Sequence, residues 1–188
     1  MSFDLSVIPN KNIVLAVTGG IAAYKSAILV RRLKDAGFNV RVVMTEGAQA
    51  FITPLTFQAL SGNPVHTELL NPEAEAGMGH IELARWADLL LVAPASCDTL
   101  AKFAAGLADD LLSTLYLATK SPVWVAPAMN QQMWAAKATQ RNLNTLVEDG
   151  VHVIMPDAGS QACGDVGLGR MPEPEDLALQ VTQYFHRA

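Results

Sequence analysis

The segment SQACGDVGLGRM, residues 160–171, carries one of the two cysteines of this chain. Cys163 lies between Ala162 and Gly164, outside any apolar run, so we expect its thiol to be within reach of solvent or a ligand. A thiol in a tuned environment titrates near neutrality and can supply a proton to a reacting carbon. The neighbouring glycines permit the backbone torsions of a hinge. The pattern predicts a flexible lid at about residues 156–172 that carries Cys163.

The segment PAMNQQMW, residues 127–134, combines an amide with two methionines. Asn130 stands where an apolar run gives way to a helical stretch, and its side chain can donate two N–H bonds to a carboxylate or carbonyl. Met129 and Met133 offer soft apolar surface suited to a flat ring. By pattern alone, a helix N-cap with methionines packed in the core explains the same residues better.

His80 is the third candidate for chemistry. It ends a glycine-containing loop, residues 71–80, just before a helical stretch, which is a place where a base can be positioned. A lone histidine is more often a surface or satisfied core residue, and on spacing alone we favour that interpretation. The same interpretation applies to the remaining histidines, which are His66, His152 and His186.

The segment TGGIAAYKS, residues 18–26, offers a place for a phosphate. A glycine pair between a strand and a helix lets backbone N–H groups approach an anion at the helix N-terminus. The spacing departs from the dinucleotide pattern G-x-G-x-x-G, and Tyr24 stands where the P-loop pattern requires glycine. Hydrolysis of ATP or GTP is therefore not expected, and an ordinary tight turn explains the glycines equally well.

Small polar residues follow two more apolar runs. Thr45 comes after NVRVVM, and Ser96, Asp98 and Thr99 of PASCDT come after DLLLVA. Each residue taken alone is explained by helix capping. Because the carboxyl ends of parallel strands share one edge of a sheet, these residues together predict a pocket there.

Apolar runs rich in β-branched residues predict a mainly parallel sheet covered on both faces. The runs are NIVLAV (12–17), NVRVVM (39–44), DLLLVA (88–93), PVWVA (122–126) and VHVIM (151–155). Helical stretches alternate with them at 22–37, 100–118, 130–150 and from about 174. This alternation predicts a single doubly wound α/β domain over residues 1–188.

Composition excludes several classes of protein. Of the 188 residues, 51% are hydrophobic and 16% charged, which excludes disorder. The net charge of −5 comes without a basic patch, so nucleic acid is not an expected partner. No apolar run approaches the roughly 20 residues that span a bilayer, so no membrane association is expected. Cys97 and Cys163 have no partners at metal-site spacing, and so few cysteines indicate a reducing, cytoplasmic compartment.

Taken in order, TGGIAAYK, MTEGAQAFITPL, GHIELARWADLLLVAPAS, PAMNQQMW and SQACGDVGLGRM resemble the flavin-dependent cysteine decarboxylases of coenzyme A biosynthesis. The resemblance covers about residues 11–186. It implies a flavodoxin-like or Rossmann-like three-layer sandwich that binds FMN. The implied reaction decarboxylates 4'-phosphopantothenoylcysteine to 4'-phosphopantetheine through a thioaldehyde and an ene-thiol. The implied assembly is a homotrimer, or a dodecamer of four trimers, with the flavin near a subunit boundary.

The resemblance also assigns roles to residues. It implies that His80 is the catalytic base, Asn130 the clamp on the substrate carboxylate and Cys163 the acid. Ser160 and Met171 would contact the pantetheine arm of the substrate. The implied flavin site consists of Gly20, Ile21, Ala22, Thr45, Ser96, Cys97, Asp98, Thr99 and Ala128. Many relatives read P-A-S-A-N-T where this chain reads P-A-S-C-D-T.

Two alternatives share the implied fold. Flavin prenyltransferases alkylate FMN, but they need neither the A-C-G lid nor the P-A-M-N clamp. A non-catalytic flavin-binding regulatory subunit is the other alternative, and such proteins commonly carry long acidic tails that this sequence lacks. Bacterial relatives often continue into a CTP-dependent phosphopantothenate-cysteine ligase, so a fused or separate ligase is an expected partner.

Overall fold

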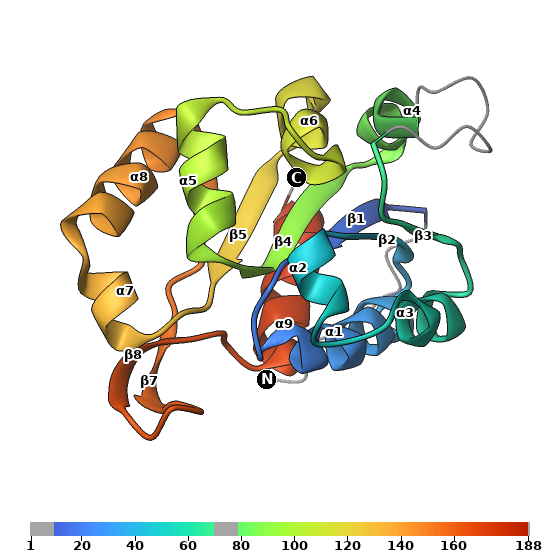
Figure 1. Cartoon of the computed structure of the whole chain (residues 1–188). Helices are drawn as coiled ribbons and strands as arrows, with labels where there is room; N and C mark the ends of the chain where they lie inside the picture. The colour runs from blue at the N-terminus through green and yellow to red at the C-terminus, as the bar shows by residue number, and fades with distance from the viewer. Residues whose placement is uncertain (1–9, 70–78, 188) are drawn as a thin grey trace.

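The computed structural model of the chain describes residues 10–69 and 79–187. Six parallel strands form its main sheet in the order β3-β2-β1-β4-β5-β6 (Figure 1). The strands are β1 (Asn12–Val17), β2 (Asn39–Met44), β3 (Val65–His66), β4 (Leu89–Ala95), β5 (Val123–Pro127) and β6 (His152–Val153). The strand order reverses between β1 and β4, and in such sheets ligands bind beyond the carboxyl ends of the strands at this point.

Helices cover both faces of the sheet, which confirms the predicted three-layer α/β fold (Figure 1). They are α1 (Ala23–Asp35), α2 (Glu46–Gln49), α3 (Pro54–Ser61), α4 (Gly79–Trp86), α5 (Cys97–Ala105), α6 (Leu111–Ala118), α7 (Gln131–Ala135), α8 (Lys137–Glu148) and α9 (Pro174–Arg187). Helices α1, α3 and α9 pack on one face, and α4, α5, α6 and α8 pack on the other. Within the described residues, no helix has the length and apolar character to cross a membrane.

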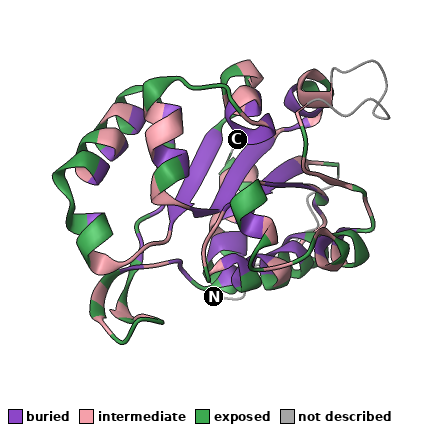
Figure 2. Ribbon diagram, viewed as in Figure 1, coloured by how far each residue is buried: buried purple, intermediate pink, exposed green. Residues whose placement is uncertain are grey.

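The central strands β4 and β5, and β1 after Asn12, are apolar because both of their faces are buried (Figure 2). Along β1, Ile13 and Leu15 join the core cluster beneath α1 and α9, whereas Val14 joins the cluster beneath α5 and α8. Successive side chains of a strand point to opposite faces, so a strand covered on both sides must be apolar at every position. The sheet is therefore a rigid support, and the loops at its carboxyl edge carry the polar groups.

Two long predicted helices are each divided in two. The stretch 100–118 is interrupted after α5 by Gly106, whose φ of +67° ends the helix, and α6 starts afresh from Asp110. The stretch 130–150 is divided at Ala136, which has extended backbone torsions between α7 and α8. The predicted strand at 151–155 is shortened to the two residues of β6.

The segment predicted as a loop at 156–172 contains a β-hairpin. Its strands β7 (Asp157–Ser160) and β8 (Val166–Arg170) pair antiparallel and form a sheet separate from the main one. The hairpin lies beside α7, outside the main sheet (Figure 1). The other long loop predicted, at 71–80, lies outside the described residues except for its last two positions, which begin α4.

Candidate active site

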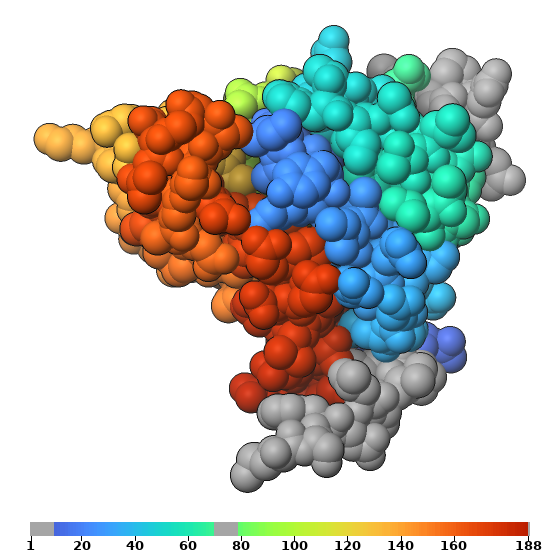
Figure 3. All heavy atoms as spheres, turned by 90° about the horizontal axis from the view of Figure 1, so that it is seen from below, coloured from blue at the N-terminus to red at the C-terminus, as the bar shows by residue number. Residues whose placement is uncertain are grey.

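A cavity of about 610 Å³ lies at the carboxyl edge of the sheet, where the loops after β1, β4 and β5 meet the hairpin. From below, a recess opens between the hairpin segment and the start of α1 (Figure 3). Most of the predicted site residues line this cavity, although they come from five separate segments. They are Gly20, Ile21, Ala22, Ser96, Cys97, Ala128, Asn130, Ser160, Cys163 and Met171.

The turn between β1 and α1 presents free backbone N–H groups. Within the described residues, no acceptor takes the N–H groups of Gly20, Ile21 and Ala22. The 13-residue helix α1 begins immediately after them, so its positive end also faces the cavity. Gly19 lies so close to α2 that an added Cβ would come within 3.1 Å of the Gly47 carbonyl carbon. The turn is thus suited to a phosphate.

A second helix start faces the same cavity. The Thr18 hydroxyl donates to the Pro94 carbonyl oxygen at 2.7 Å and accepts from the Ser96 backbone N–H at 2.8 Å, which fixes the end of β4 against β1. Ser96 then caps α5, since its Oγ accepts from the Thr99 backbone N–H at 3.2 Å. Cys97 lines the cavity next to this cap, and its Sγ lies 3.4 Å from Thr139 Oγ1.

Three of the residues implied for the flavin site do not line the cavity. Thr45 caps α2 and accepts from the Ala48 N–H at 3.3 Å. Thr99 is buried and accepts a hydrogen bond from Ser96 Oγ at 3.0 Å. Asp98 is exposed on the first turn of α5, with a carboxylate oxygen 3.9 Å from Lys102 Nζ. Thr45 and Thr99 therefore stabilise helix starts near the cavity, whereas Asp98 lies on the exposed side of α5.

The hairpin is held against the loop after β5 by backbone and side-chain hydrogen bonds. The Met129 N–H donates to the Gly169 oxygen at 2.9 Å. Gln161 Oε1 accepts from the Gln131 N–H at 3.0 Å, while its Nε2 donates to the Met129 oxygen at 3.3 Å. A Cβ at Gly169 would lie 2.2 Å from the Met129 oxygen, so only glycine allows this contact. This contact gives Gly169 a packing role that the hinge interpretation of the glycines did not include.

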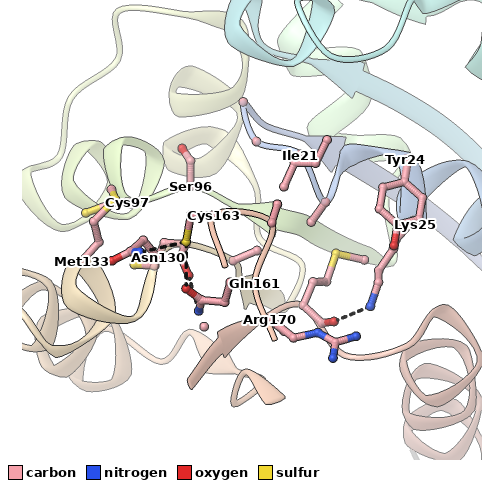
Figure 4. A pocket seen from close by; sticks show the side chains of 18 of the residues that line it. Ile21, Tyr24, Lys25, Ser96, Cys97, Asn130, Met133, Gln161, Cys163 and Arg170 are labelled. Atoms are coloured by element: carbon pink, nitrogen blue, oxygen red, sulfur yellow. Dashed lines mark hydrogen bonds between the residues drawn. The ribbon is translucent and has the colours of Figure 1, made fainter. Parts of the chain in front are cut away.

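The hairpin brings the two most specific sequence candidates together. Asn130 Nδ2 lies 3.4 Å from Cys163 Sγ, and the two side chains point toward one another (Figure 4). The same Nδ2 donates to Asp165 Oδ2 at 2.9 Å. Asn130 also caps α7, since its Oδ1 accepts from the Gln132 N–H at 2.8 Å. The capping and the functional interpretations of Asn130 are therefore compatible.

The opposite end of the cavity is cationic. Lys25 is buried, and its Nζ donates to the Met171 oxygen at 2.9 Å (Figure 4). The same Nζ donates to Glu173 Oε1 at 2.7 Å. Arg170 lies nearby, with Nη2 3.5 Å from the same Glu173 oxygen. These are the only charged side chains among the described lining residues. In a chain of net charge −5, this cavity therefore favours an anionic ligand.

His80 lies away from the cavity within this chain. It is the second residue of α4, a helix that packs on α6 and contributes no lining residue. Its Nδ1 atom is buried and, within the described residues, has no hydrogen-bond partner. The structure therefore brings Asn130 and Cys163 together but leaves His80 apart from them.

Several lining residues were not among the predicted site residues. They are Gly19, Tyr24, Lys25, Met129, Met133, Gln161, Ala162, Gly169 and Arg170. The residue type of Met129 and Met133 did indicate a contact with a ligand, because methionine side chains suit a flat ring. Lys25 and Arg170 had none, because the sequence does not show that α1 and the end of the hairpin share one wall. No metal cluster of three or more His, Cys, Asp or Glu side chains occurs within residues 10–69 and 79–187.

A doubly wound sheet with an apolar cavity and free N–H groups at its switch point defines a cofactor-binding α/β protein. The family described as Flavoprotein matches residues 4–186, and the chain belongs to that family. It is 58% identical over 181 residues to the Coenzyme A biosynthesis bifunctional protein CoaBC of Vibrio vulnificus (strain YJ016). That match covers 96% of this chain but 45% of the relative, so the chain spans under half of that protein's length.

Two solved structures are similar over nearly their whole length. A mutant PPC decarboxylase complexed with pantothenoylaminoethenethiol has a TM-score of 0.84 and 34% identity, covering 94% of this chain and 99% of that one. The FMN binding protein AtHal3 has a TM-score of 0.82 and 35% identity, covering 95% of this chain and 98% of that one. These similarities agree with the family resemblance seen in the sequence motifs.

Proposed function

We propose that this chain binds FMN and decarboxylates 4'-phosphopantothenoylcysteine to 4'-phosphopantetheine in coenzyme A biosynthesis. The observation that carries the proposal is the contact between the Asn130 amide and the Cys163 thiol at 3.4 Å at the tip of the hairpin. An amide donor and a proton donor at one place suit a reaction that holds a carboxylate and then protonates a carbon. The relatives in coenzyme A biosynthesis and the PPC decarboxylase neighbour support the same substrate.

The cavity fits FMN by its chemistry. The free N–H groups of Gly20, Ile21 and Ala22, with the start of α5, would hold the phosphate. Met129 and Met133, which line the same cavity, would contact the ring. When bound, FMN supplies the reversible two-electron oxidation that makes loss of CO₂ from a cysteine-derived carboxylate feasible.

The chain's own residues would then perform the remaining tasks. Asn130 would orient the substrate carboxylate, and the hairpin would exclude water from the thioaldehyde. Departure of CO₂ leaves its electron pair on the thiocarbonyl unit as an ene-thiolate. Cys163 would deliver a proton to the carbon as that intermediate is reduced, and the thiolate would regain its proton from solvent. Ser160 and Met171, which line the cavity, would contact the pantetheine arm.

We propose that the working assembly is a homotrimer or a dodecamer, with the site completed between subunits. His80 does not line the cavity of its own chain, so as the base it would act on a site of a neighbouring subunit. The cavity mouth also has apolar surface to cover, since Ile21 is 59% and Tyr24 56% exposed. Exposed apolar residues at such a mouth suit a subunit contact.

Other expectations accompany this proposal. Because the bifunctional relatives are about twice as long as this chain, a fused or separate CTP-dependent ligase is the proposed source of the substrate. Both cysteines are free thiols, which supports a reducing compartment and hence the cytoplasmic location. Neither a flavin prenyltransferase nor a non-catalytic flavin-binding subunit would use an amide paired with a thiol, so neither alternative is favoured.

The proposal is tested by the absorbance of the purified chain and by CO₂ release from 4'-phosphopantothenoylcysteine. We expect a flavin spectrum and turnover to 4'-phosphopantetheine. Cys163→Ser should retain CO₂ release but accumulate the oxidised ene-thiol, because the proton donor for the last step is weakened. Asp157→Asn, at an exposed position of the same hairpin outside the cavity lining, is the control and should form the saturated product. A colourless chain that cannot be reconstituted with FMN would refute the proposal.

A further inference from the structure

The Asp165 carboxylate contacts both of the residues that carry the proposed chemistry. Its Oδ2 accepts from Asn130 Nδ2 at 2.9 Å and lies 3.5 Å from Cys163 Sγ. The second hydrogen of Nδ2 points to Cys163 Sγ at 3.4 Å. A carboxamide nitrogen has two hydrogens, so both are taken up within the protein. Asn130 thus already binds one carboxylate, which belongs to the chain itself.

This contact conflicts with the role proposed for Asn130. A substrate carboxylate needs the same Nδ2 hydrogens, and two carboxylates on one amide would repel each other. Asp165 can move away because it lies at the tip of the hairpin, between β7 and β8, and is only half-buried. Asn130 itself is held in place by the start of α7. The contact between Asn130 and Asp165 is therefore the one that must open.

We infer, on the basis of the proposed function, that Asp165 is an exchangeable carboxylate that occupies Asn130 whenever a ligand carboxylate is absent. An arriving carboxylate displaces it, and loss of that carboxylate as CO₂ lets it return. Because Cys163 is two residues away on the same hairpin tip, the return of Asp165 brings the thiol back to the site when its proton is needed. Asp165 is in this way a positioning residue for Cys163 and a selector for carboxylate-bearing ligands.

The exchange is tested without turnover by alkylation of Cys163. Iodoacetate carries a carboxylate and iodoacetamide does not, and with either reagent the thiol sulfur displaces iodide and its proton passes to solvent. Site-resolved mass spectrometry distinguishes Cys163 from Cys97. Asp165→Asn should raise the ratio of the iodoacetate rate to the iodoacetamide rate by about tenfold, since a neutral amide oxygen holds the Asn130 N–H group less strongly than a carboxylate does and the reagent carboxylate displaces it more easily. An unchanged ratio would overturn the inference.

Two variants separate exchange from general charge effects. Asp157→Asn removes the same charge from the exposed base of the same hairpin and should leave the ratio unchanged. Adding Asn130→Ala to Asp165→Asn should abolish the gain, because the gain depends on the amide. A ratio that rises equally in Asp157→Asn, or that stays high without the Asn130 amide, would contradict the exchange.

A second measurement follows the consequence for turnover. Asp165→Asn should bind 4'-phosphopantothenoylcysteine about tenfold more tightly with unchanged affinity for 4'-phosphopantetheine, which has no carboxylate. It should also release a larger share of oxidised ene-thiol per CO₂, because Cys163 returns less often. Equal losses in CO₂ release and in reduction would indicate a structural role and overturn the inference. If the wild-type chain releases no CO₂ but the alkylation ratio responds as expected, the proposed function fails and the exchange stands.

Discussion

At the scale of single residues, the site depends on side chains that serve structure and chemistry together. Asn130 ends the loop after β5, caps α7 and directs both N–H bonds toward the hairpin tip. Capping fixes the amide at no cost to its donors, since the cap uses the carbonyl oxygen. An N-cap at the edge of a cavity can thus be a precise anchor for a ligand.

Asn130→Asp should greatly reduce decarboxylation while leaving flavin bound. The new carboxylate keeps the cap acceptor but has no N–H group, so it repels the substrate carboxylate and faces Asp165 at hydrogen-bond distance. Loss of a hydrogen bond to a charged group costs about 1.5–3 kcal/mol, and repulsion adds to it. The checks are kcat/KM and the flavin absorbance of the purified variant. Undiminished turnover would contradict the role of Asn130 as a clamp.

The family resemblance, more than the residue types alone, predicted which residues gather at the cavity. Cys163, Asn130 and the Gly20 turn converge on one cavity as the sequence suggested, since each follows a strand or lies in the lid segment. The contacts of Lys25 with Met171 and Glu173 span nearly 150 positions of sequence, and no local pattern reports such a distant pairing. The sequence also did not show that Asp98 lies outside the cavity, because this depends on how α5 is rotated about its own axis.

At the scale of elements, a hairpin replaces the expected loop. Cross-strand pairing from Asp157–Arg170 to Ser160–Val166 gives the segment a fixed shape, and the glycines of β8 bring its backbone against the loop before α7. The sequence concealed this hairpin because its strands are polar and glycine-rich, without the alternation typical of a half-buried strand. The helices predicted at 100–118 and 130–150 were also wrong, because each is divided into two. In the first, Asp110 is the N-cap that starts α6, and the sequence analysis did not identify it as a helix start.

Gly169→Ala should move the hairpin off the cavity. The added Cβ would meet the Met129 oxygen at 2.2 Å, and the φ of +135° also disfavours alanine. Strain of this kind costs about 1–3 kcal/mol, and we expect lost activity with flavin still bound. Gly150→Ala is the control, since Gly150 has a φ of +88° but no atom within 4 Å of an added Cβ. It should lower the free energy of unfolding without affecting activity.

The cap of α6 gives the fold a pH-dependent element. Burial favours the neutral form of Asp110, but hydrogen bonds from the Ser113 N–H and hydroxyl and the ammonium of Lys102 outweigh it, so the pKa lies below its usual value. A lowered pKa gives stability that is present above the unfolded value of about 3.9 and is lost as pH falls through the folded value.

Asp110→Ala should therefore lower the free energy of unfolding by about 1 kcal/mol at neutral pH, which is the usual loss for a cap. The difference from wild type should shrink as the pH falls below about 4, since protonation then weakens the wild-type cap as well. Urea unfolding at a series of pH values is the measurement. Asp157→Ala, at an exposed position of β7, should have the same free energy of unfolding as wild type at each pH.

At the scale of the whole molecule, the distance between His80 and the cavity is the main structural argument for assembly. The sheet places α4 on a different part of the molecule from the hairpin (Figure 1). If His80 acts on a neighbouring subunit, the particle in solution should have a mass of three, or four times three, chains of 20.1 kDa. Native mass spectrometry distinguishes these sizes from a single chain.

Mixing two inactive variants tests the shared site directly. His80→Asn and Asn130→Asp chains, unfolded together and refolded into mixed assemblies, should regain part of the wild-type activity. The regained activity arises because some sites then receive His80 from one chain and Asn130 from the other. Each variant refolded alone should stay inactive. No recovery from mixed assemblies of confirmed composition would place both residues in the same chain's site.

The buried ammonium of Lys25 has one more consequence. It donates to the Met171 carbonyl oxygen, and the buried Pro172 follows, so the end of the hairpin segment is bound to α1, whereas the tip is held through the side chains of Gln161 and Asp165. If the hairpin opens, its tip must therefore move while the segment at Met171 stays in place. A long, thin molecule would therefore enter past Cys163 tail first, and its reactive head would stop beside the thiol.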